Sequence, residues 1–187
     1  MTNRARARRI KMVLTDVDGT LTDGTLAVLP DGEEVKSYHV RDGFGVLLAQ
    51  IAGLETGIIT GKRSRALEKR AERLKITELH QGILDKKPVF EDILLRRGLA
   101  AEEVAYIGDD FGDISVMRLA GLSAAVADAH PVVRSEARFV CRTAGGRGAF
   151  REFVEFIIGA QKKWGAVKAR FEDLFGEMNN PSQGGSE

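Results

Sequence analysis

Two aspartates separated by one residue follow the first apolar segment of the chain. Asp16 and Asp18 come directly after residues 11–15 (KMVLT), and Gly19 follows them. Side chains two residues apart on a strand point to the same side, and active sites of parallel sheets lie at the carboxyl ends of strands. Aspartates at a strand end can also be plain turn formers. The spacing favours chemistry, with one carboxylate as nucleophile and the other as acid/base.

A second group of carboxylates lies in the segment YIGDDFGD at residues 106–113. It supplies Asp109, Asp110 and Asp113 within five residues. Carboxylates gathered at one sheet edge repel one another, and a helix N-terminus relieves only part of that repulsion. A divalent cation would resolve the conflict. The all-oxygen ligand set predicts Mg²⁺ rather than zinc, which prefers nitrogen and sulfur.

Two further segments predict an anion site. Thr60 and Gly61 close an apolar segment just before a helical one, where backbone N–H groups can hold an anion. Lys86 precedes Pro88, which stands where a helix should begin. A cation there is unfavourable unless an anion lies nearby. A turn and a solvated lysine are the alternatives, but together with the carboxylates these residues indicate phosphoryl transfer.

The elements that must position these residues alternate along the chain. Short β-branched segments alternate with longer amphipathic ones, and this predicts an α/β fold with a doubly wound, Rossmann-like parallel sheet. The expected strands are 11–15, 56–60, 77–80, 103–108, 122–127 and 137–141. The expected helices are 43–53, 64–75, 88–98, 113–121 and a segment from about 147 to 177, broken near Gly159 or Gly165.

Residues 25–40 interrupt this alternation. Two strand-like arms flank Pro30, Asp31 and Gly32, which form a strong turn signal. The pattern predicts a β-hairpin inserted after the first strand. Such a hairpin is marginally stable alone and exposes strand edges, so an oligomer contact is favoured over a surface decoration.

The overall composition is that of one ordinary globular domain. The chain has 187 residues, 43% of them hydrophobic, and a net charge of +1. No nucleic-acid or membrane partner is expected, and no secretory or membrane-spanning segment is apparent. The single cysteine, Cys141, fits a buried strand position and a cytoplasmic location. The expected division is a solvated basic arm at 1–9, one domain at 10–165, and a C-terminal helix with a disordered tail at 166–187.

The order of these motifs resembles the haloacid dehalogenase (HAD) superfamily of phosphohydrolases. The resemblance is carried by DVDGT at 16–20, TG at 60–61, Lys86 and GDDFGD at 108–113. Further segments resemble the capless branch that acts on 2-keto-3-deoxy sugar-acid phosphates, and the likeness spans residues 10–165. These segments are HVRDGFG (39–45), IITGK (58–62), HQGILDKK (80–87), AYIGDDFGD (105–113), AVADAHP (125–131) and AGGRGAFRE (144–152).

The resemblance implies an activity and a role for each matching residue. The activity is Mg²⁺-dependent hydrolysis of 3-deoxy-D-manno-octulosonate (KDO) 8-phosphate, a step toward lipopolysaccharide. Asp16 would become phosphorylated, and Asp18 would exchange protons with the leaving oxygen and with water. Mg²⁺ would be held by Asp16, Asp109 and the backbone carbonyl of Asp18. Asp110 and Asp113 would position the loop that carries Asp109. Thr60, Gly61 and Lys86 would bind the phosphate. The fold would lack a cap domain, and the hairpin would join four copies of the chain in a homotetramer.

The same resemblance implies a pocket for the sugar acid. The matching positions are His39, Val40, Arg41, Asp42, Gly43, Lys62, Arg70 and Arg147. Lys62 stands where relatives often carry arginine, so it can meet a carboxylate without the bidentate fork. Solvated or structural roles are the alternatives for Arg41 and Lys62. Arg147 lies in a Gly-rich segment, and it could serve its own site or a neighbour's.

Other readings differ in substrate or in class. A phosphatase for 2-keto-3-deoxynonulosonate 9-phosphate or a sialic acid 9-phosphate is the main enzymatic alternative, but that branch tends to carry an acidic residue at the position of Lys62. A phospho-accepting receiver module of signalling proteins also uses aspartates, a threonine and a lysine. Its phosphorylated aspartate belongs to a later strand, whereas the paired acids here follow the first. A non-catalytic scaffold would be expected to lack Asp16 or Asp18.

Overall fold

Six parallel strands form the central sheet of this computed structural model, which describes residues 1–179. Their order is β5-β4-β1-β6-β7-β8, so the first strand lies in the interior of the sheet. The strands are β1 (Met12–Thr15), β4 (Glu55–Thr60), β5 (Glu78–Gln81), β6 (Val104–Gly108), β7 (Leu122–Ala125) and β8 (Phe139–Val140). The predicted sheet is therefore confirmed.

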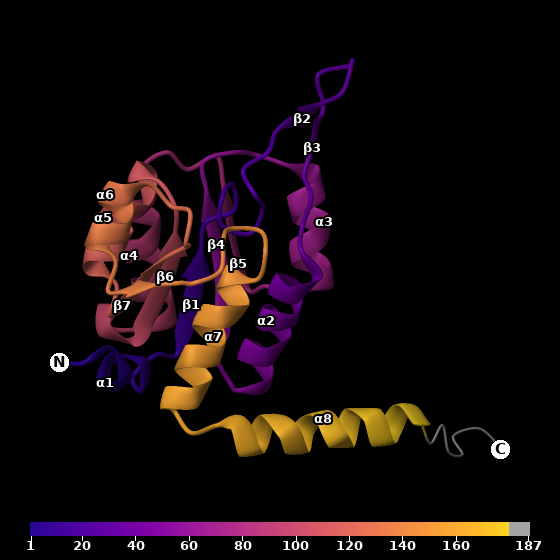
Figure 1. The fold of residues 1–187 in the computed structure, drawn as a ribbon, viewed down its shortest axis with the longest axis vertical. Helices are drawn as coiled ribbons and strands as arrows, with labels where there is room; N and C mark the ends of the chain where they lie inside the picture. The colour runs from indigo at the N-terminus through magenta and orange to yellow at the C-terminus, as the bar shows by residue number, and fades with distance from the viewer. Residues whose placement is uncertain (180–187) are drawn as a thin grey trace.

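Helices cover both faces of this sheet (Figure 1). On one face α2 and α7 pack against each other, and on the other α4, α5 and α6 lie together. The α-helices are α1 (Asn3–Ala7), α2 (Val40–Ile51), α3 (Arg65–Arg73), α4 (Lys86–Arg97), α5 (Ile114–Leu119), α6 (Pro131–Glu136), α7 (Ala149–Ala160) and α8 (Trp164–Asn179). Two short 3₁₀ turns, η1 (Ala101–Glu103) and η2 (Phe111–Asp113), flank β6. No helix within residues 1–179 is long and apolar enough to cross a membrane.

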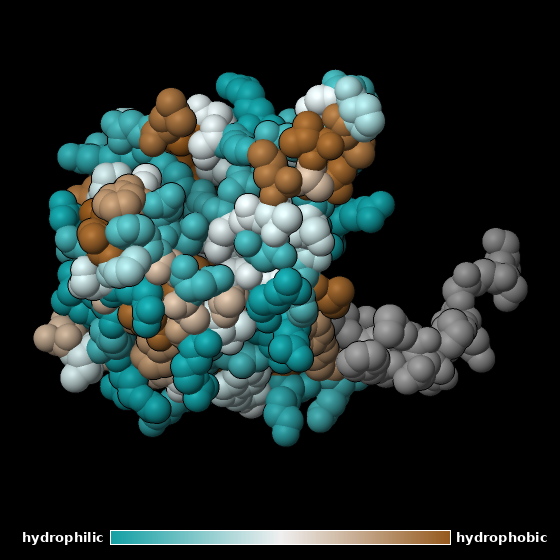
Figure 2. Space-filling model, turned by 45° about the horizontal axis from the view of Figure 1, so that its top comes forward, coloured by the Kyte–Doolittle hydropathy of each residue, from teal (hydrophilic) through white to brown (hydrophobic). Residues whose placement is uncertain are grey.

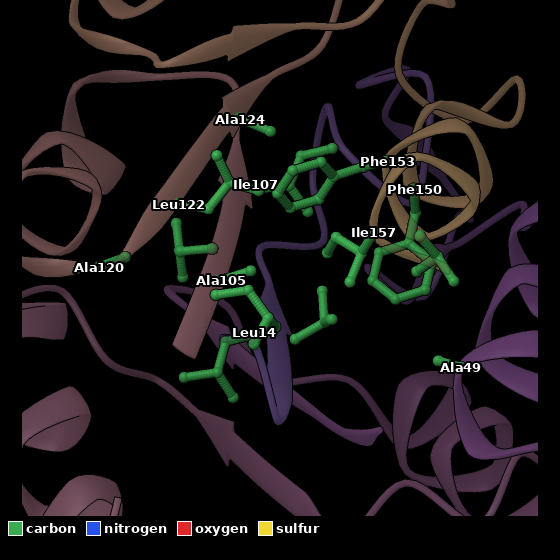
Figure 3. Close-up of a cluster of buried hydrophobic side chains, with 14 of the residues drawn as sticks. Leu14, Ala49, Ala105, Ile107, Ala120, Leu122, Ala124, Phe150, Phe153 and Ile157 are labelled. Carbon is green, nitrogen blue, oxygen red and sulfur yellow. The ribbon is translucent and has the colours of Figure 1, made fainter. Parts of the chain in front are cut away.

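The core extends over both faces of the sheet, and one part of it lies between the sheet and α7. Phe150, Phe153 and Ile157 recur at helical spacing and are fully buried, and Figure 3 shows them on the side of α7 that faces the strands, where Ile107 lies. All four residues of β1 are buried, because both its neighbours and both layers of helices cover it. This packing fixes the direction of β1 and so the place where Asp16 leaves the sheet.

Several boundaries differ from the predicted ones. The helix α6 was not predicted; its Pro131 stands at the first turn and His130 caps it through Nδ1, which accepts from the backbone of Val132. The helix α2 begins at Val40 rather than residue 43. Val167 is buried, so the core extends past the predicted boundary at residue 165. The predicted disordered tail at 180–187 lies outside the described residues.

The basic N-terminal segment was expected to be a solvated arm, and this was wrong. Residues 3–7 form α1, and Ala7 is fully buried. The guanidinium group of Arg6 donates to the carbonyl of Gly121 at 3.1 Å, and that of Arg8 donates to the carbonyl of Ala160 at 3.3 Å. The small apolar residues thus face the core, while the arginines hydrogen-bond to carbonyl groups of distant segments. Cys141 is buried, as expected.

The segment between β1 and α2 leaves the body of the molecule. Its strands β2 (Ala27–Val28) and β3 (Glu34–Val35) pair antiparallel as a separate two-stranded sheet. Figure 1 shows this hairpin projecting at the top of the view, above the sheet. Four of its apolar side chains are 44–59% exposed: Leu26, Val28, Leu29 and Val35. Figure 2 shows apolar side chains gathered on this part of the surface.

Candidate active site

The loop after β1 places Asp16 at the edge of the sheet. Thr15 of β1 lies in register with Ile58 of β4 and Ile107 of β6, so all three strands end at the same edge. Gly19 has a φ of +89°, and a Cβ there would lie 2.1 Å from a carboxylate oxygen of Asp109. Only glycine therefore allows the loop after β1 and the loop after β6 to approach this closely.

Lys86, the first residue of α4, joins two carboxylates beneath this edge. Its Nζ donates to Asp16 Oδ1 at 2.5 Å and to Asp113 Oδ1 at 2.6 Å. It also lies 3.2 Å from the hydroxyl of Tyr106. All four side chains are buried. The lysine therefore reaches the first aspartate directly, and Tyr106, which sequence reasoning missed, completes the group.

Asp113 supports the loop that carries the other carboxylates. Its Oδ2 accepts from the backbone N–H groups of Asp109 and Asp110 at 2.9 and 3.1 Å. Its Oδ1 accepts from Lys86 and from the Tyr106 hydroxyl, the latter at 2.6 Å. Both oxygens of Asp113 are therefore engaged within the protein, and this favours a structural role over metal ligation.

No sequence signal for Tyr106 was available, because a tyrosine inside an apolar strand is usually a packing residue.

A metal ion would fit among these carboxylates. Oxygens of Asp16, Asp109 and Asp113 lie within 4.8 Å of one another. Asp109 Oδ1 accepts from the Thr20 hydroxyl at 2.9 Å. Since Asp113 is already engaged on both oxygens, Asp16 and Asp109 are the side chains with oxygens left to offer. The side chain of Asp18 turns elsewhere, to the ammonium group of Lys36.

The raised pKa values of Asp16 and Asp109 indicate that negative charge is in excess among these carboxylates. Burial raises the pKa of Asp16 to about 6, with Asp113 adding to the rise and Lys86 opposing it. Burial likewise raises the pKa of Asp109 to about 7, and the negative charges of Asp16 and Asp113 contribute. Desolvation opposes protonation of Lys86, but both carboxylates outweigh it and raise its pKa. One lysine thus leaves the three carboxylates with excess negative charge, which suits a divalent cation.

The predicted phosphate-binding residues are placed around the same edge. Thr60 is the last residue of β4 and is buried, with its carbonyl accepting from Ile83 at 3.0 Å. Gly61 follows it at the edge where β1 also ends. Thr60 and Gly61 belong to one segment and Lys86 to another, and the parallel strands bring both segments to the same edge of the sheet.

The hairpin adds two contacts that the sequence did not reveal. Lys36 donates to Asp18 Oδ1, and only 4% of the lysine side chain is exposed. Lys62 donates to both carboxylate oxygens of Glu34, at 3.2 and 3.1 Å. The second pair is about 40% exposed and adds little stability. The return arm of the hairpin thus lies against the site.

The predicted sugar-acid residues fall into several environments. His39 caps α2, and Val40 is 80% exposed. Asp42 is buried and accepts from the backbone of Gly148 at 3.0 Å, so it holds the Gly-rich segment in place. Gly43 lies against Arg70, whose guanidinium a Cβ would meet at 2.3 Å.

The two remaining arginines border a cationic cleft. Its volume is about 690 Å³, and it is lined by Arg41, Arg142, Arg147 and Arg151 together with two glutamates. Arg147 pairs with Asp23 at 3.1 Å. A Cβ on Gly145 would lie 1.7 Å from the carbonyl oxygen of Gly19, so the Gly-rich segment packs directly on the loop after β1.

Comparison with known proteins agrees with this geometry. A family model described as haloacid dehalogenase-like hydrolase matches residues 75–152. The chain is 44% identical over 166 residues to 3-deoxy-D-manno-octulosonate 8-phosphate phosphatase KdsC of Escherichia coli K12, covering 89% of this chain and 88% of that protein. It is 45% identical to the Yersinia pestis KdsC over 158 residues, 84% of each chain.

Solved structures give the same result. The crystal structure of the Yersinia pestis phosphatase has a TM-score of 0.84 at 44% identity, covering 86% of both chains. The Moraxella catarrhalis phosphatase, solved in complex with a magnesium ion, a phosphate ion and a KDO molecule, has a TM-score of 0.87 at 34% identity, covering 90% of this chain and 97% of that one. The chain belongs to the haloacid dehalogenase-like hydrolases, in the family of the 3-deoxy-D-manno-octulosonate 8-phosphate phosphatases.

Proposed function

We propose that this protein hydrolyses KDO 8-phosphate to KDO and phosphate, with Mg²⁺ as cofactor. The observation that carries the proposal is the buried group in which Lys86 joins Asp16 and Asp113 beside Asp109. A group of this kind suits an aspartate nucleophile that attacks phosphorus. The names of relatives that are 44% identical over 89% of the chain support the substrate.

The reaction divides between the two aspartates after β1. A carboxylate oxygen of Asp16 forms a bond to phosphorus while the bond from phosphorus to the sugar oxygen breaks, and Asp18 gives its proton to that oxygen. A water oxygen then attacks phosphorus, the bond to Asp16 breaks, and Asp18 takes the proton of the water. Asp16, Asp109 and the backbone carbonyl of Asp18 would hold Mg²⁺, which when bound offsets the negative charge of carboxylates and phosphate.

The remaining residues bind and orient the substrate. Thr60, Gly61 and Lys86 hold the phosphoryl oxygens, and Asp110 and Asp113 position the loop of Asp109. The sugar acid meets a pocket built from the residues that match the family: His39, Val40, Arg41, Asp42, Gly43, Lys62, Arg70 and Arg147. Lys62 offers an ammonium group to the sugar carboxylate when its exposed pair with Glu34 opens.

The proposal extends to assembly and location. The apolar side chains of Leu26, Val28, Leu29 and Val35 are exposed on a two-stranded hairpin, which supports a homotetramer built through residues 25–40. Arg147 then acts in its own or a neighbouring site. A cytoplasmic location is proposed from the lone, buried Cys141.

A panel of phosphate esters tests the substrate. With Mg²⁺, the value of kcat/KM is expected to be at least about tenfold higher for KDO 8-phosphate than for the 9-phosphates of 2-keto-3-deoxynonulosonate and sialic acid, because one misplaced polar contact costs about a factor of ten or more. Phosphate release is the measurement. Equal turnover of many unrelated esters would refute the specificity and leave the reaction class intact.

Mg²⁺ binding is expected to depend strongly on pH. The pKa values of Asp16 and Asp109 are raised to about 6 and 7, so protons compete with the metal below that range. The apparent affinity for Mg²⁺ should weaken at least about tenfold from pH 8 to pH 5.5. Isothermal titration calorimetry of the metal-free protein at both pH values provides the check. An Asp109→Asn variant should bind weakly at either pH, and a pH-independent affinity in the parent would contradict the site.

A further inference from the structure

We propose that Lys36 is a positioning residue for the reaction: it holds the carboxylate of Asp18 in the orientation needed for proton transfer to and from the leaving oxygen. The inference rests on the proposed function, in which Asp18 is the acid/base. It assigns to the hairpin a part in the chemistry of its own subunit, besides any contact with other copies of the chain.

The return arm of the hairpin presents alternate side chains to the site. Residues 34, 36 and 38 are half-buried, whereas Val35 and Ser37 between them are exposed. This period of two is that of an extended segment with one face covered. Glu34 contacts Lys62, Lys36 contacts Asp18, and the guanidinium of Arg70 lies 6.0 Å from the ring centre of Tyr38.

The carboxylate of Asp18 is held by a single hydrogen bond, from Lys36. Asp16 is held by Lys86, Asp109 by Thr20, and Asp113 by four donors. Within residues 1–179, Lys36 is the one hydrogen-bond donor to the Asp18 side chain, which is 33% exposed. Without it, no hydrogen bond in the described part of the chain would hold this carboxylate.

The geometry of the pair suits a positioning role. The ammonium group occupies Oδ1 of Asp18, and this leaves Oδ2 for the proton that the leaving oxygen receives. The lysine side chain is almost fully buried, so its position is set by packing rather than by solvent. A catalytic group held by a rigid neighbour loses less freedom on reaching the transition state.

The surroundings of Lys36 indicate that its site faces the sugar rather than the phosphate. The hydroxyl of Tyr38 is buried and has no hydrogen-bond partner within residues 1–179. Burial, and then the charge of Asp18, raises the pKa of this tyrosine. The phosphate side is instead built from Lys86 and the end of β4. The neighbours of Lys36 on this arm, Glu34 and Tyr38, contact Lys62 and Arg70 of the proposed sugar pocket. We therefore assign Lys36 to the side of the leaving group, and its effect should depend on how much that group needs a proton.

The test compares two esters with the variant Lys36→Met, which keeps the length of the side chain and removes its charge. For KDO 8-phosphate, whose leaving alkoxide requires protonation, kcat/KM is expected to fall about 10- to 100-fold. For p-nitrophenyl phosphate, whose leaving group is stable without a proton, the fall should be less than about threefold. The constant kcat/KM is used because it reports only the steps up to release of the alcohol.

Matched variants separate the possible outcomes. Lys69→Met removes an exposed lysine paired with Glu72 and should change neither ester. Asp18→Asn should show the same dependence on the leaving group, and adding Lys36→Met to it should cause little further loss, because the lysine acts through Asp18. A full further loss in the double variant, or equal losses on both esters, would overturn the proposal.

Failure of the proposed function gives a different result. If Asp18→Asn affects both esters equally, then Asp18 is not the acid/base, whatever Lys36 does. If Lys36→Met does not fold, Lys36→Gln retains a hydrogen-bond donor and should recover part of the selective loss on the sugar phosphate. A folded Lys36→Ala enzyme, which has no donor at this position, would overturn the proposal if it equalled Lys69→Met on both esters.

Discussion

Replacing Asp16 with asparagine is expected to reduce kcat at least about a thousandfold, because the amide is a poor nucleophile and cannot form the phosphorylated intermediate. The protein should still fold. The substitution removes one of three clustered carboxylates, and that lowers the repulsion which, together with burial, raises the pKa of Asp109. Phosphate release measures the loss, and thermal unfolding measures the stability.

The control for this experiment is Asp92→Asn, an exposed aspartate paired with Arg96 on α4. It should retain parental activity. Mass spectrometry of acid-quenched protein during turnover should find the phosphoryl group on the peptide that contains Asp16. A phosphoryl group on any other side chain, or activity retained in Asp16→Asn, would refute the nucleophile.

Replacing Lys86 with methionine is expected to remove activity and to destabilise the protein. Lys86 is 5% exposed and bridges Asp16 and Asp113, so its loss leaves two buried carboxylates without their counter-charge. Breaking a buried pair in this way costs about 3–5 kcal/mol of unfolding free energy. Urea denaturation of the metal-free protein near pH 8 measures this difference.

The destabilisation should shrink as the pH falls. The folded pKa of Asp16 is about 6, above its ordinary value of 3.8, and Lys86 is the group that lowers it. Without the lysine the carboxyl stays protonated to higher pH. Relative to the parent, the variant therefore loses stability as the pH rises from about 6 to the higher pKa of its own Asp16 carboxyl, so the loss should be smaller near pH 5 than near pH 8.

The neighbouring lysine is the matched control for this comparison. Lys87 is about half-exposed and lies 3.8 Å from Glu91. Lys87→Met should change the unfolding free energy by less than about 0.5 kcal/mol at either pH. Similar losses in the two variants would mean that the bridge beneath Asp16 does not stabilise the fold.

The sequence by itself determined where the strands end and which residues stand there. Strand periodicity placed Asp16, Thr60 and Gly108 at the ends of β1, β4 and β6, and parallel strands bring such ends to one edge. Lys86 could be placed near the start of α4 because Pro88 marks the first turn of that helix. These predictions succeeded because strands, caps and turns depend on residues close together in the chain.

Only the tertiary structure decided how these groups contact one another. The pairing of Lys36 with Asp18 depends on the path of an exposed arm, and no local pattern specifies that path. Tyr106 resembled any buried strand residue until β6 was placed beside the start of α4. Arg6 resembled a solvated residue, although it binds a carbonyl 115 residues away. Such contacts follow from packing between distant segments, which periodicity and end signals do not encode.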